Sequence, residues 1–372
     1  MHTEFLMGNE AIALGALAAG VNVVCGYPGT PSSEVLETVA KRKTEHTYVE
    51  WSVNEKTAME GALGMSYMGK RALVCMKHVG MNVCADAFMN AAITGVNGGL
   101  VVVAADDPSM HSSQNEQDSR FYAKFAMIPC LEPSNQQEAY DMMHYAFDLS
   151  ESLRTPVLLR VTTRMAHSRA VVTLADPREQ NGLSTPENPR QWILLPANSR
   201  MRYNTLLEEQ DLFEKDALEG GFNHYQPGED KRMGIVACGI AYNYLMENYP
   251  EGCPFPVVKI QQYPLPKALV ERLVSEGVKE VMVMEEGQPV VEEQMRALVP
   301  SSIPVTGRLT GALPRAGELT PDSVRQALGL EALASYDAEP LVAPRPPALC
   351  QGCGHRDMYA ALNEVAREYP DS

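Results

Sequence analysis

The sequence predicts an α/β protein built from parallel sheets with helices on both faces. Three observations support this fold class. Between residues 8 and 160, short apolar runs alternate regularly with helical patterns, which is typical of strands and helices in a parallel sheet. The same alternation returns between about residue 233 and residue 328. The strand-like runs are apolar throughout, so we expect both faces of each sheet to be covered.

The expected elements can be placed in order along both blocks. In the first block, helical periodicity covers residues 8–20, 32–42, 54–69, 82–94 and 136–153. Apolar runs typical of buried strands cover residues 21–25, 46–51, 72–76, 98–105 and 155–161. In the second block, strands are expected at 234–239, 256–260 and 280–286, and helices at 240–249, 267–277 and 289–298.

These patterns divide the chain into five segments. We expect a first α/β domain at 1–175, an irregular linker or surface excursion at 176–230, a second α/β domain at 231–333, a Pro-rich linker at 334–349, and the start of a third domain at 350–372. The last segment holds one helix, which cannot bury its apolar stripe alone. We therefore expect further residues or another chain to complete it.

Composition and charge exclude several classes of partner. The chain has 47 acidic and 31 basic residues, a formal net charge of −16, which argues against nucleic acid or an anionic membrane as the main partner. The longest apolar runs are too short to span a bilayer. The first 19 residues lack the basic region of a signal peptide, so we expect a cytoplasmic protein.

The carboxyl ends of parallel strands are where such sheets bind ligands, and the motif GYPGTPSSE (residues 26–34) follows the first strand. Gly29 permits close approach of the backbone, and Thr30 supplies a hydroxyl group. A turn with a helix cap explains Ser32 or Ser33 fully, but it leaves Thr30 unexplained.

Glu55 follows the second strand, in the first turn of a predicted helix. Such a glutamate is ordinarily a solvated residue favoured by the helix dipole. The small residues after it, Ala58, Gly61, Ala62 and Gly64, predict close packing and a poorly hydrated crevice. In that setting the carboxyl group could exchange protons near neutral pH.

Two further features follow the third and fourth strands. KHVGMN (residues 77–82) brings a cation, an imidazole and an amide, although His78 taken singly is more often a structural histidine. The polar loop from Asp106 to Arg120 is either a solvated surface loop or a lid over a substrate.

Cys350 and Cys353 form a C-x-x-C-x-H motif with a following histidine. Haem attachment requires the histidine directly after the second cysteine, so it is excluded. A zinc or iron–sulfur site needs about four ligands, and the alternative is a pair of unligated thiols on a Gly-rich turn. The other six cysteines are scattered singly and are expected to be buried, reduced thiols.

The chain resembles one known family through GYPGTPSSE, VNEKTAMEGALG, KHVGMN, DDPSMHSSQNEQDSR, PVLLRVTTR and LCQGCGHR. These motifs resemble the α subunits of indolepyruvate:ferredoxin oxidoreductases, in the thiamine-diphosphate-dependent 2-oxoacid:ferredoxin oxidoreductase superfamily. The resemblance implies that 1–175 is a pyrimidine-binding domain, that 231–333 is a transketolase C-terminal-like domain, and that 350–372 begins the diphosphate-binding domain.

The same resemblance implies roles for individual residues. Glu55 matches the glutamate that hydrogen-bonds the aminopyrimidine ring of thiamine diphosphate and assists proton transfer there. The cofactor-binding set would be Gly29, Thr30, Glu55, His78, Met81 and Asn82. Thr30 would also lie beside the substrate.

Three further assignments follow. His111 and Arg120, from the polar loop, are candidates for binding the substrate carboxylate. Cys350 and Cys353 match a pair that helps to hold a [4Fe–4S] cluster in related oxidoreductases. The Mg²⁺-binding motif of the family is absent from the 372 residues, so we expect the chain to be inactive alone. We expect it to be a truncated subunit, and a naturally split subunit is the alternative.

The implied activity is oxidative decarboxylation of an aromatic 2-oxoacid, such as indolepyruvate, to an acyl-CoA with reduction of ferredoxin. The implied partners are a β subunit, ferredoxin, coenzyme A and a second α subunit. Two alternatives stay open: a non-oxidative thiamine-dependent 2-oxoacid decarboxylase, and a non-catalytic partner subunit.

Overall fold

The computed structural model describes residues 2–186, 188–334, 339, 341–342, 349 and 352–369. Two compact units are present, Met1–Glu331 and Ala332–Ser372. Within the residues described, no helix combines the length and the hydrophobicity that a membrane span requires.

A seven-stranded sheet in the order β12-β6-β7-β5-β4-β2-β3 forms the first block. Six of its strands are mutually parallel: β2 (Val23–Gly26), β3 (Tyr48–Trp51), β4 (Ala72–Lys77), β5 (Leu100–Asp106), β6 (Cys130–Leu131) and β7 (Val157–Thr162). The edge strand β12 (Gln262–Tyr263) comes from the second block and pairs antiparallel with β6. The predicted fold class is confirmed.

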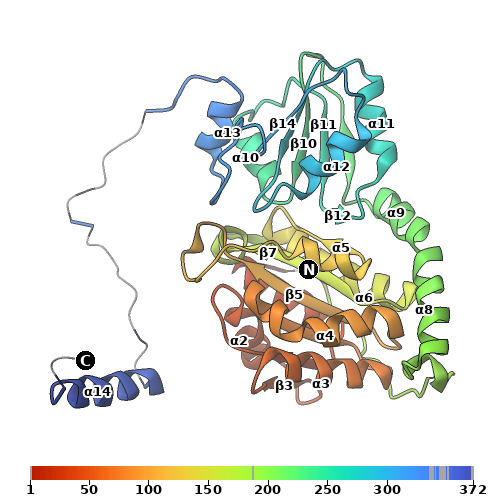
Figure 1. Ribbon diagram of the computed structural model, residues 1–372, viewed down its shortest axis with the longest axis vertical. Helices are drawn as coiled ribbons and strands as arrows, with labels where there is room; N and C mark the ends of the chain where they lie inside the picture. The colour runs from red at the N-terminus through yellow and green to blue at the C-terminus, as the bar shows by residue number, and fades with distance from the viewer. Residues whose placement is uncertain are drawn as a thin grey trace. The chain divides into compact units, whose positions relative to one another are not determined.

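Helices cover both faces of this sheet because successive side chains of a strand point to opposite sides. Leu73 and Cys75 of β4 belong to the core beneath α1 (Gly8–Ala18), α2 (Ser33–Arg42) and α6 (Gln136–Leu153). Val74 and Met76 belong to the core beneath α3 (Glu55–Tyr67) and α4 (His78–Thr94), which lie side by side (Figure 1). These helices agree closely with the sequence patterns, and α6 does so at both ends.

Some elements differ from the expectation. Helix α4 begins at His78, four residues before the expected start, so most of KHVGMN forms helical turns and not a loop. Between residues 2 and 174, the elements that we did not predict are β1 (His2–Met7) and β8 (Arg169–Leu174), which pair antiparallel, α5 (Arg120–Ala126), α7 (Thr163–His167), β6 and the short 3-10 helix η1 (Pro108–Met110).

The second block is a five-stranded sheet in the order β14-β13-β10-β11-β9. Its strands are β9 (His224–Gln226), β10 (Gly234–Cys238), β11 (Val257–Ile260), β13 (Val281–Met284) and β14 (Val305–Thr306), all parallel except the edge strand β9. Its helices are α10 (Ala241–Glu247), α11 (Lys267–Ser275), α12 (Val290–Leu298) and α13 (Pro321–Ala327). Buried residues of α10 and α13 line one face of the sheet, and those of α11 and α12 line the other.

The segment 176–230 is more regular than expected. It contains η2 (Pro189–Trp192), α8 (Pro196–Glu208), α9 (Gln210–Glu219) and β9. Helix α8 buries only Leu206, and α9 buries only Phe213 and Ala217. Because so few apolar side chains face the core, the helical periodicity is weak in the sequence, which explains the wrong expectation of irregular structure.

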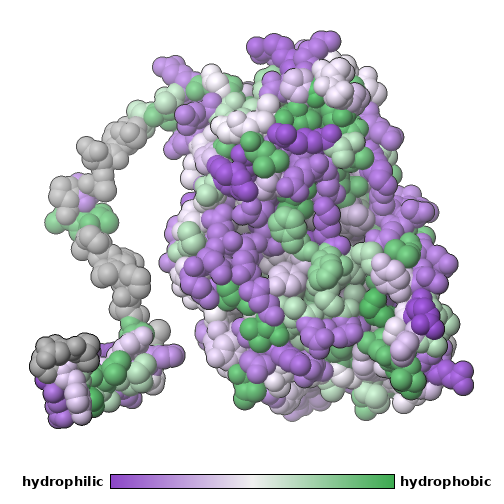
Figure 2. Space-filling view, in the orientation of Figure 1, coloured by the Kyte–Doolittle hydropathy of each residue, from purple (hydrophilic) through white to green (hydrophobic). Residues whose placement is uncertain are grey.

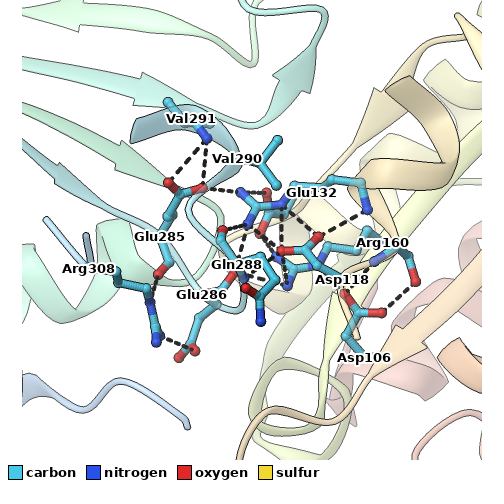
Figure 3. Close-up of polar contacts among 12 residues, drawn as sticks. Asp106, Asp118, Glu132, Arg160, Glu285, Glu286, Gln288, Val290, Val291 and Arg308 are labelled. Carbon is cyan, nitrogen blue, oxygen red and sulfur yellow. Dashed lines mark hydrogen bonds and ion pairs between the residues drawn. The ribbon is translucent and has the colours of Figure 1, made fainter. Parts of the chain in front are cut away.

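A buried ionic cluster joins the two blocks of the first unit (Figure 3). Its members are Asp106, Asp118, Arg120, Glu132 and Arg160 from the first block and Glu285, Glu286 and Arg308 from the second. Arg160 Nε donates to Asp106 Oδ2 at 2.7 Å, and Arg120 Nη1 donates to Glu285 Oε2 at 2.8 Å. Charges buried in this way are stable only when each has a partner.

The second unit contains α14 (Gly354–Ala366), as the sequence predicted. All residues of α14 are exposed. Hydrophobic residues are part of its surface in Figure 2, and the larger ones are Met358, Tyr359, Leu362 and Val365.

Candidate active site

Four sequence features meet at one edge of the first sheet. Strands β5, β4, β2 and β3 are neighbours and run parallel, so their carboxyl ends lie along the same edge. The turn with Thr30 follows β2, Glu55 follows β3, His78 follows β4 and the polar loop follows β5. In parallel α/β sheets this edge is where ligands bind.

The turn after β2 is closed by its own serines. Ser32 Oγ donates to the carbonyl oxygen of Gly29 at 2.8 Å, and the N–H of Gly29 donates to Ser33 Oγ at 2.9 Å. Thr30 between them is exposed, and its hydroxyl bonds none of the described residues. The turn therefore accounts for Ser32 and Ser33 and leaves the Thr30 hydroxyl available to a ligand.

A buried asparagine that the sequence reasoning missed holds this turn. Asn9 of α1 is fully buried, and its Nδ2 donates to the carbonyl oxygen of Pro31 at 2.7 Å and to Glu34 Oε2 at 2.9 Å. His167 Nε2 lies 3.6 Å from Glu34 Oε1, an ion-pair distance. The imidazole of His167 lowers the pKa of Glu34 to about 2. An asparagine in the first turn of the mainly apolar helix GNEAIALGALA was the available clue.

Glu55 is 9% exposed and is the first residue of α3. Asn54 caps this helix by accepting from the N–H of Thr57 at 2.9 Å, so the Glu55 side chain is not needed for capping. It lies against Gly80 of α4: a Cβ on Gly80 would be 2.8 Å from Glu55 Oε1. None of the described residues hydrogen-bonds its carboxylate.

The crowding around Glu55 has a different origin from the one we predicted. Gly61 and Gly64 are exposed, and a Cβ at either position would meet nothing within 4 Å. The expected close packing is present at Ala58 and Ala62, which are fully buried, and was wrong for these two glycines. The close approach comes from Gly80, which is distant in sequence.

The three candidates on α4 lie in different surroundings. His78 is fully buried; its Nε2 lies 3.3 Å from the carbonyl oxygen of Asn115, and its Nδ1 has no partner among the described residues. Met81 is fully buried in the core. Asn82 is exposed and accepts a hydrogen bond from the hydroxyl of Tyr122 on α5.

The two cations suggested for the substrate carboxylate already have acidic partners. Arg120 is 2% exposed and donates to Asp118, Glu285, Tyr263 and the carbonyl oxygens of Glu286 and Gln288. His111 is exposed, and its Nε2 lies 3.3 Å from Glu318 Oε2. Arg120 therefore belongs to the ionic cluster, and neither position supports the role that we expected.

No metal or cluster site is assembled within the described part of the chain. No three His, Cys, Asp or Glu side chains there are grouped to hold an ion. Cys353 Sγ lies 3.3 Å from His355 Nδ1, and Cys350 falls outside the described residues. The described residues alone therefore do not complete a site for Mg²⁺ or a [4Fe–4S] cluster. The carboxylate of Glu55 and the buried Nδ1 of His78, neither of which has a hydrogen-bond partner among the described residues, do fit a polar organic ring.

This arrangement is that of a cofactor-binding α/β domain with an acidic residue at the carboxyl edge of its sheet. The chain belongs to the thiamine-diphosphate-binding family of pyruvate flavodoxin/ferredoxin oxidoreductases. The sequence pattern of that family matches residues 14–214.

Two relatives and one solved structure add detail. The indolepyruvate oxidoreductase subunit IorA of Methanothermobacter thermautotrophicus is 43% identical over 98% of this chain and 61% of its own length. That of Archaeoglobus fulgidus is 41% identical over 99% of this chain and 62% of its own length. The chain thus spans about three fifths of these relatives.

One solved structure has a similar fold, with a TM-score of 0.69 and 17% sequence identity. It is the 2-oxoglutarate:ferredoxin oxidoreductase from Magnetococcus marinus with 2-oxoglutarate, coenzyme A and succinyl-CoA bound. The match covers 88% of this chain and 65% of that one.

Proposed function

We propose that this chain is the cofactor-ring part of the α subunit of an indolepyruvate:ferredoxin oxidoreductase. The complete enzyme would convert aromatic 2-oxoacids to acyl-CoA and reduce ferredoxin. The observation that carries the proposal is the buried Glu55, whose carboxylate has no hydrogen-bond partner among the described residues. The names of the IorA relatives support the choice of substrate.

Thiamine diphosphate would supply the reactive carbon and the electron sink that a 2-oxoacid decarboxylation requires. Glu55 would hold a proton at the ring nitrogen of the aminopyrimidine. The Thr30 hydroxyl would hydrogen-bond the substrate or the cofactor ring, and Gly29 would let the backbone approach it. The Nδ1 of His78, which has no partner among the described residues, would face the same ligand. Met81 would pack behind His78, and Asn82 of α4, which bonds Tyr122 of α5, would border the site.

The remaining parts of the enzyme would come from outside the described residues. These are the Mg²⁺ and [4Fe–4S] sites, with Cys350 and Cys353 contributing to the latter, and the β subunit, ferredoxin, coenzyme A and a second α subunit. We propose accordingly that residues 1–372 alone are inactive and that the enzyme is cytoplasmic. The proposed domain division at residues 175 and 231 goes with this assignment.

The test is a Glu55→Gln substitution in the complete α subunit, co-expressed with its β subunit and purified without oxygen. Thiamine-dependent reduction of ferredoxin by indolepyruvate should fall by about 100-fold or more, since a positioned proton donor is worth that much. Circular dichroism should be unchanged. The matched control is Glu60→Gln on the same helix, where the side chain is exposed and pairs only with Lys56 at 3.7 Å.

Full activity of Glu55→Gln would refute the assignment. Release of an aldehyde without ferredoxin reduction, from a protein without iron–sulfur absorbance, would identify a decarboxylase instead. No thiamine dependence with any partner, and one zinc per chain, would identify a non-catalytic subunit.

A further inference from the structure

Lys77 is a buried cation that forms no ion pair with any of the described residues. It is the last residue of β4, directly before α4, and it is 9% exposed. The other buried Lys and Arg side chains in the described part of the chain all form ion pairs: Arg71 with Glu151, Arg120 with Asp118, Arg160 with Asp106, Lys259 with Glu138 and Arg308 with Glu286. Among the described residues, no carboxylate lies within ion-pair distance of Lys77.

The ammonium group of Lys77 uses only one hydrogen-bond acceptor in the described structure. Its Nζ donates to the carbonyl oxygen of Ser112, whereas an ammonium group has three N–H donors. Asp107 attracts the ammonium group of Lys77 from beyond ion-pair distance. The carboxylate oxygens of Asp107 accept hydrogen bonds from Ser112, Ser113 and Thr163. Burial lowers the pKa of Lys77, and the attraction of Asp107 opposes that shift. An anion beside the ammonium group would stabilise its charged form.

The side chain of Lys77 lies at the candidate active site. Its stem packs on Gly29, where a Cβ would be 3.1 Å from Lys77 Cβ, and Gly29 directly precedes Thr30. Its ammonium group reaches the polar loop at Ser112. The next residue, His78, is fully buried and has a free Nδ1. Two polar groups without complete partners are therefore adjacent at the edge of the sheet where Thr30 lies.

We propose that Lys77 binds the carboxylate of the 2-oxoacid substrate. The inference rests on the proposed function and deepens it by naming the residue that selects an acid. The pKa of Asp107 is lowered, so this carboxylate carries negative charge at the same edge, and a site without a cation would repel an anionic substrate. Arg120 and His111 already face acidic partners. A charge-assisted hydrogen bond from Lys77 would hold the carboxylate beside Thr30.

The experiment measures binding and needs no turnover. Indole-3-propionate and its uncharged amide are titrated by calorimetry into the complete enzyme, as wild type and with Lys77→Gln. Glutamine retains an N–H donor for Ser112 and removes the charge. The wild type should prefer the acid, and in Lys77→Gln the affinity for the acid should fall by about 30-fold or more, as for loss of a buried ion partner. The affinity for the amide should be unchanged.

Two further variants sharpen the comparison. Lys77→Arg keeps the charge and should recover most of the preference for the acid. Lys70→Gln is the matched control: Lys70 Nζ also donates to a backbone carbonyl, that of Asn181 at 2.6 Å, but it lies before the opposite end of β4. Its substitution should leave both affinities unchanged. The KM for indolepyruvate should rise in Lys77→Gln and that for coenzyme A should not.

Several results would overturn the proposal. The first is a wild-type enzyme that binds the acid and the amide equally, a measurement that remains available if Lys77→Gln does not fold. The second is a folded Lys77→Gln enzyme with the wild-type preference. The third is a variant that loses thiamine diphosphate or coenzyme A instead of the acid, since Lys77 would then bind a phosphate. Failure of the proposed function would be a separate result. In that case the wild-type enzyme would show no thiamine-dependent oxidation of indolepyruvate.

Discussion

A methyl group on Gly80 would lie 2.6 Å from Cγ of Glu55 and 3.0 Å from its Cδ. Helices α3 and α4 therefore approach so closely that the Glu55 side chain occupies the space that any other residue at position 80 would need. This contact fixes the direction of the carboxylate, on which the proposed proton transfer depends.

A Gly80→Ala substitution should therefore displace Glu55. We expect at least about a tenfold loss of activity in the complete enzyme, and a loss of about 1–3 kcal/mol in the free energy of unfolding from overpacking. The matched control is Gly64→Ala on α3, which faces open space and should be neutral or stabilising by about 0.5–1 kcal/mol. Activity assays and urea unfolding measure the two effects. Full activity of Gly80→Ala would show that the position of Glu55 does not matter.

An Asn9→Ala substitution should loosen the turn that carries Thr30. It removes the hydrogen bonds to Pro31 and Glu34 and leaves a buried carbonyl group without a donor, so the free energy of unfolding should fall by about 1–3 kcal/mol. The KM for the 2-oxoacid should rise as well. Asn90→Ala is the control, because Asn90 only bonds Asp86 within the exposed part of α4. An unchanged KM with reduced stability would limit Asn9 to a structural role.

The pair formed by Glu34 and His167 should make stability depend on pH in two directions. The pKa of Glu34 falls from 4.5 to about 2 in the folded chain, chiefly through His167, so its contribution is present above about pH 4.5 and is lost as the pH falls toward 2. The pKa of His167 is raised from 6.5, chiefly by Glu34, so its contribution is present below that value and is lost as the pH rises through the raised pKa.

Unfolding measured against pH for the wild type and Glu34→Gln checks this prediction. The difference in stability should be largest in mildly acidic solution and should shrink toward both extremes. A difference that stays constant across the pH range would contradict the linkage.

Removal of Arg160 should be far more damaging than removal of an exposed arginine. Arg160→Met leaves Asp106, Asp118 and Glu132 with one partner fewer in a buried site, and the expected cost is about 3–5 kcal/mol. Arg164→Met breaks a half-exposed pair with Glu318 and should cost at most about 1 kcal/mol. Chemical unfolding of both variants gives the comparison. Equal costs would mean that the ionic cluster does not stabilise the junction of the two blocks.

The sequence was most informative where one periodic pattern dominates. The ends of α6, most strands of the two sheets and the parallel arrangement of those strands follow from apolar runs and helical spacing that are local properties. The helices α8 and α9 were missed because they bury few apolar residues and so leave little periodicity to detect.

The position of a candidate residue in the fold could be predicted from the sequence in some cases and not in others. Strand ends can be located in a sequence, so Thr30, Glu55 and His78 could be placed on one edge of the sheet. Arg120 looked like a free cation in a polar loop, yet it pairs with Glu285, a residue far along the chain. Lys77 was visible as a cation at the end of a strand, but the sequence could not show that it would be buried with no carboxylate of the described residues at ion-pair distance.

The sequence by itself therefore determined the α/β class, the order of the elements and the edge on which the polar motifs gather, because hydrophobic periodicity acts over a few neighbouring residues. Only the tertiary structure decided that Gly80 confines Glu55, that Asn9 holds the turn after β2, and which cations are already neutralised. Those relationships depend on contacts between residues distant in sequence, and such contacts exist only after the helices have packed on the sheet.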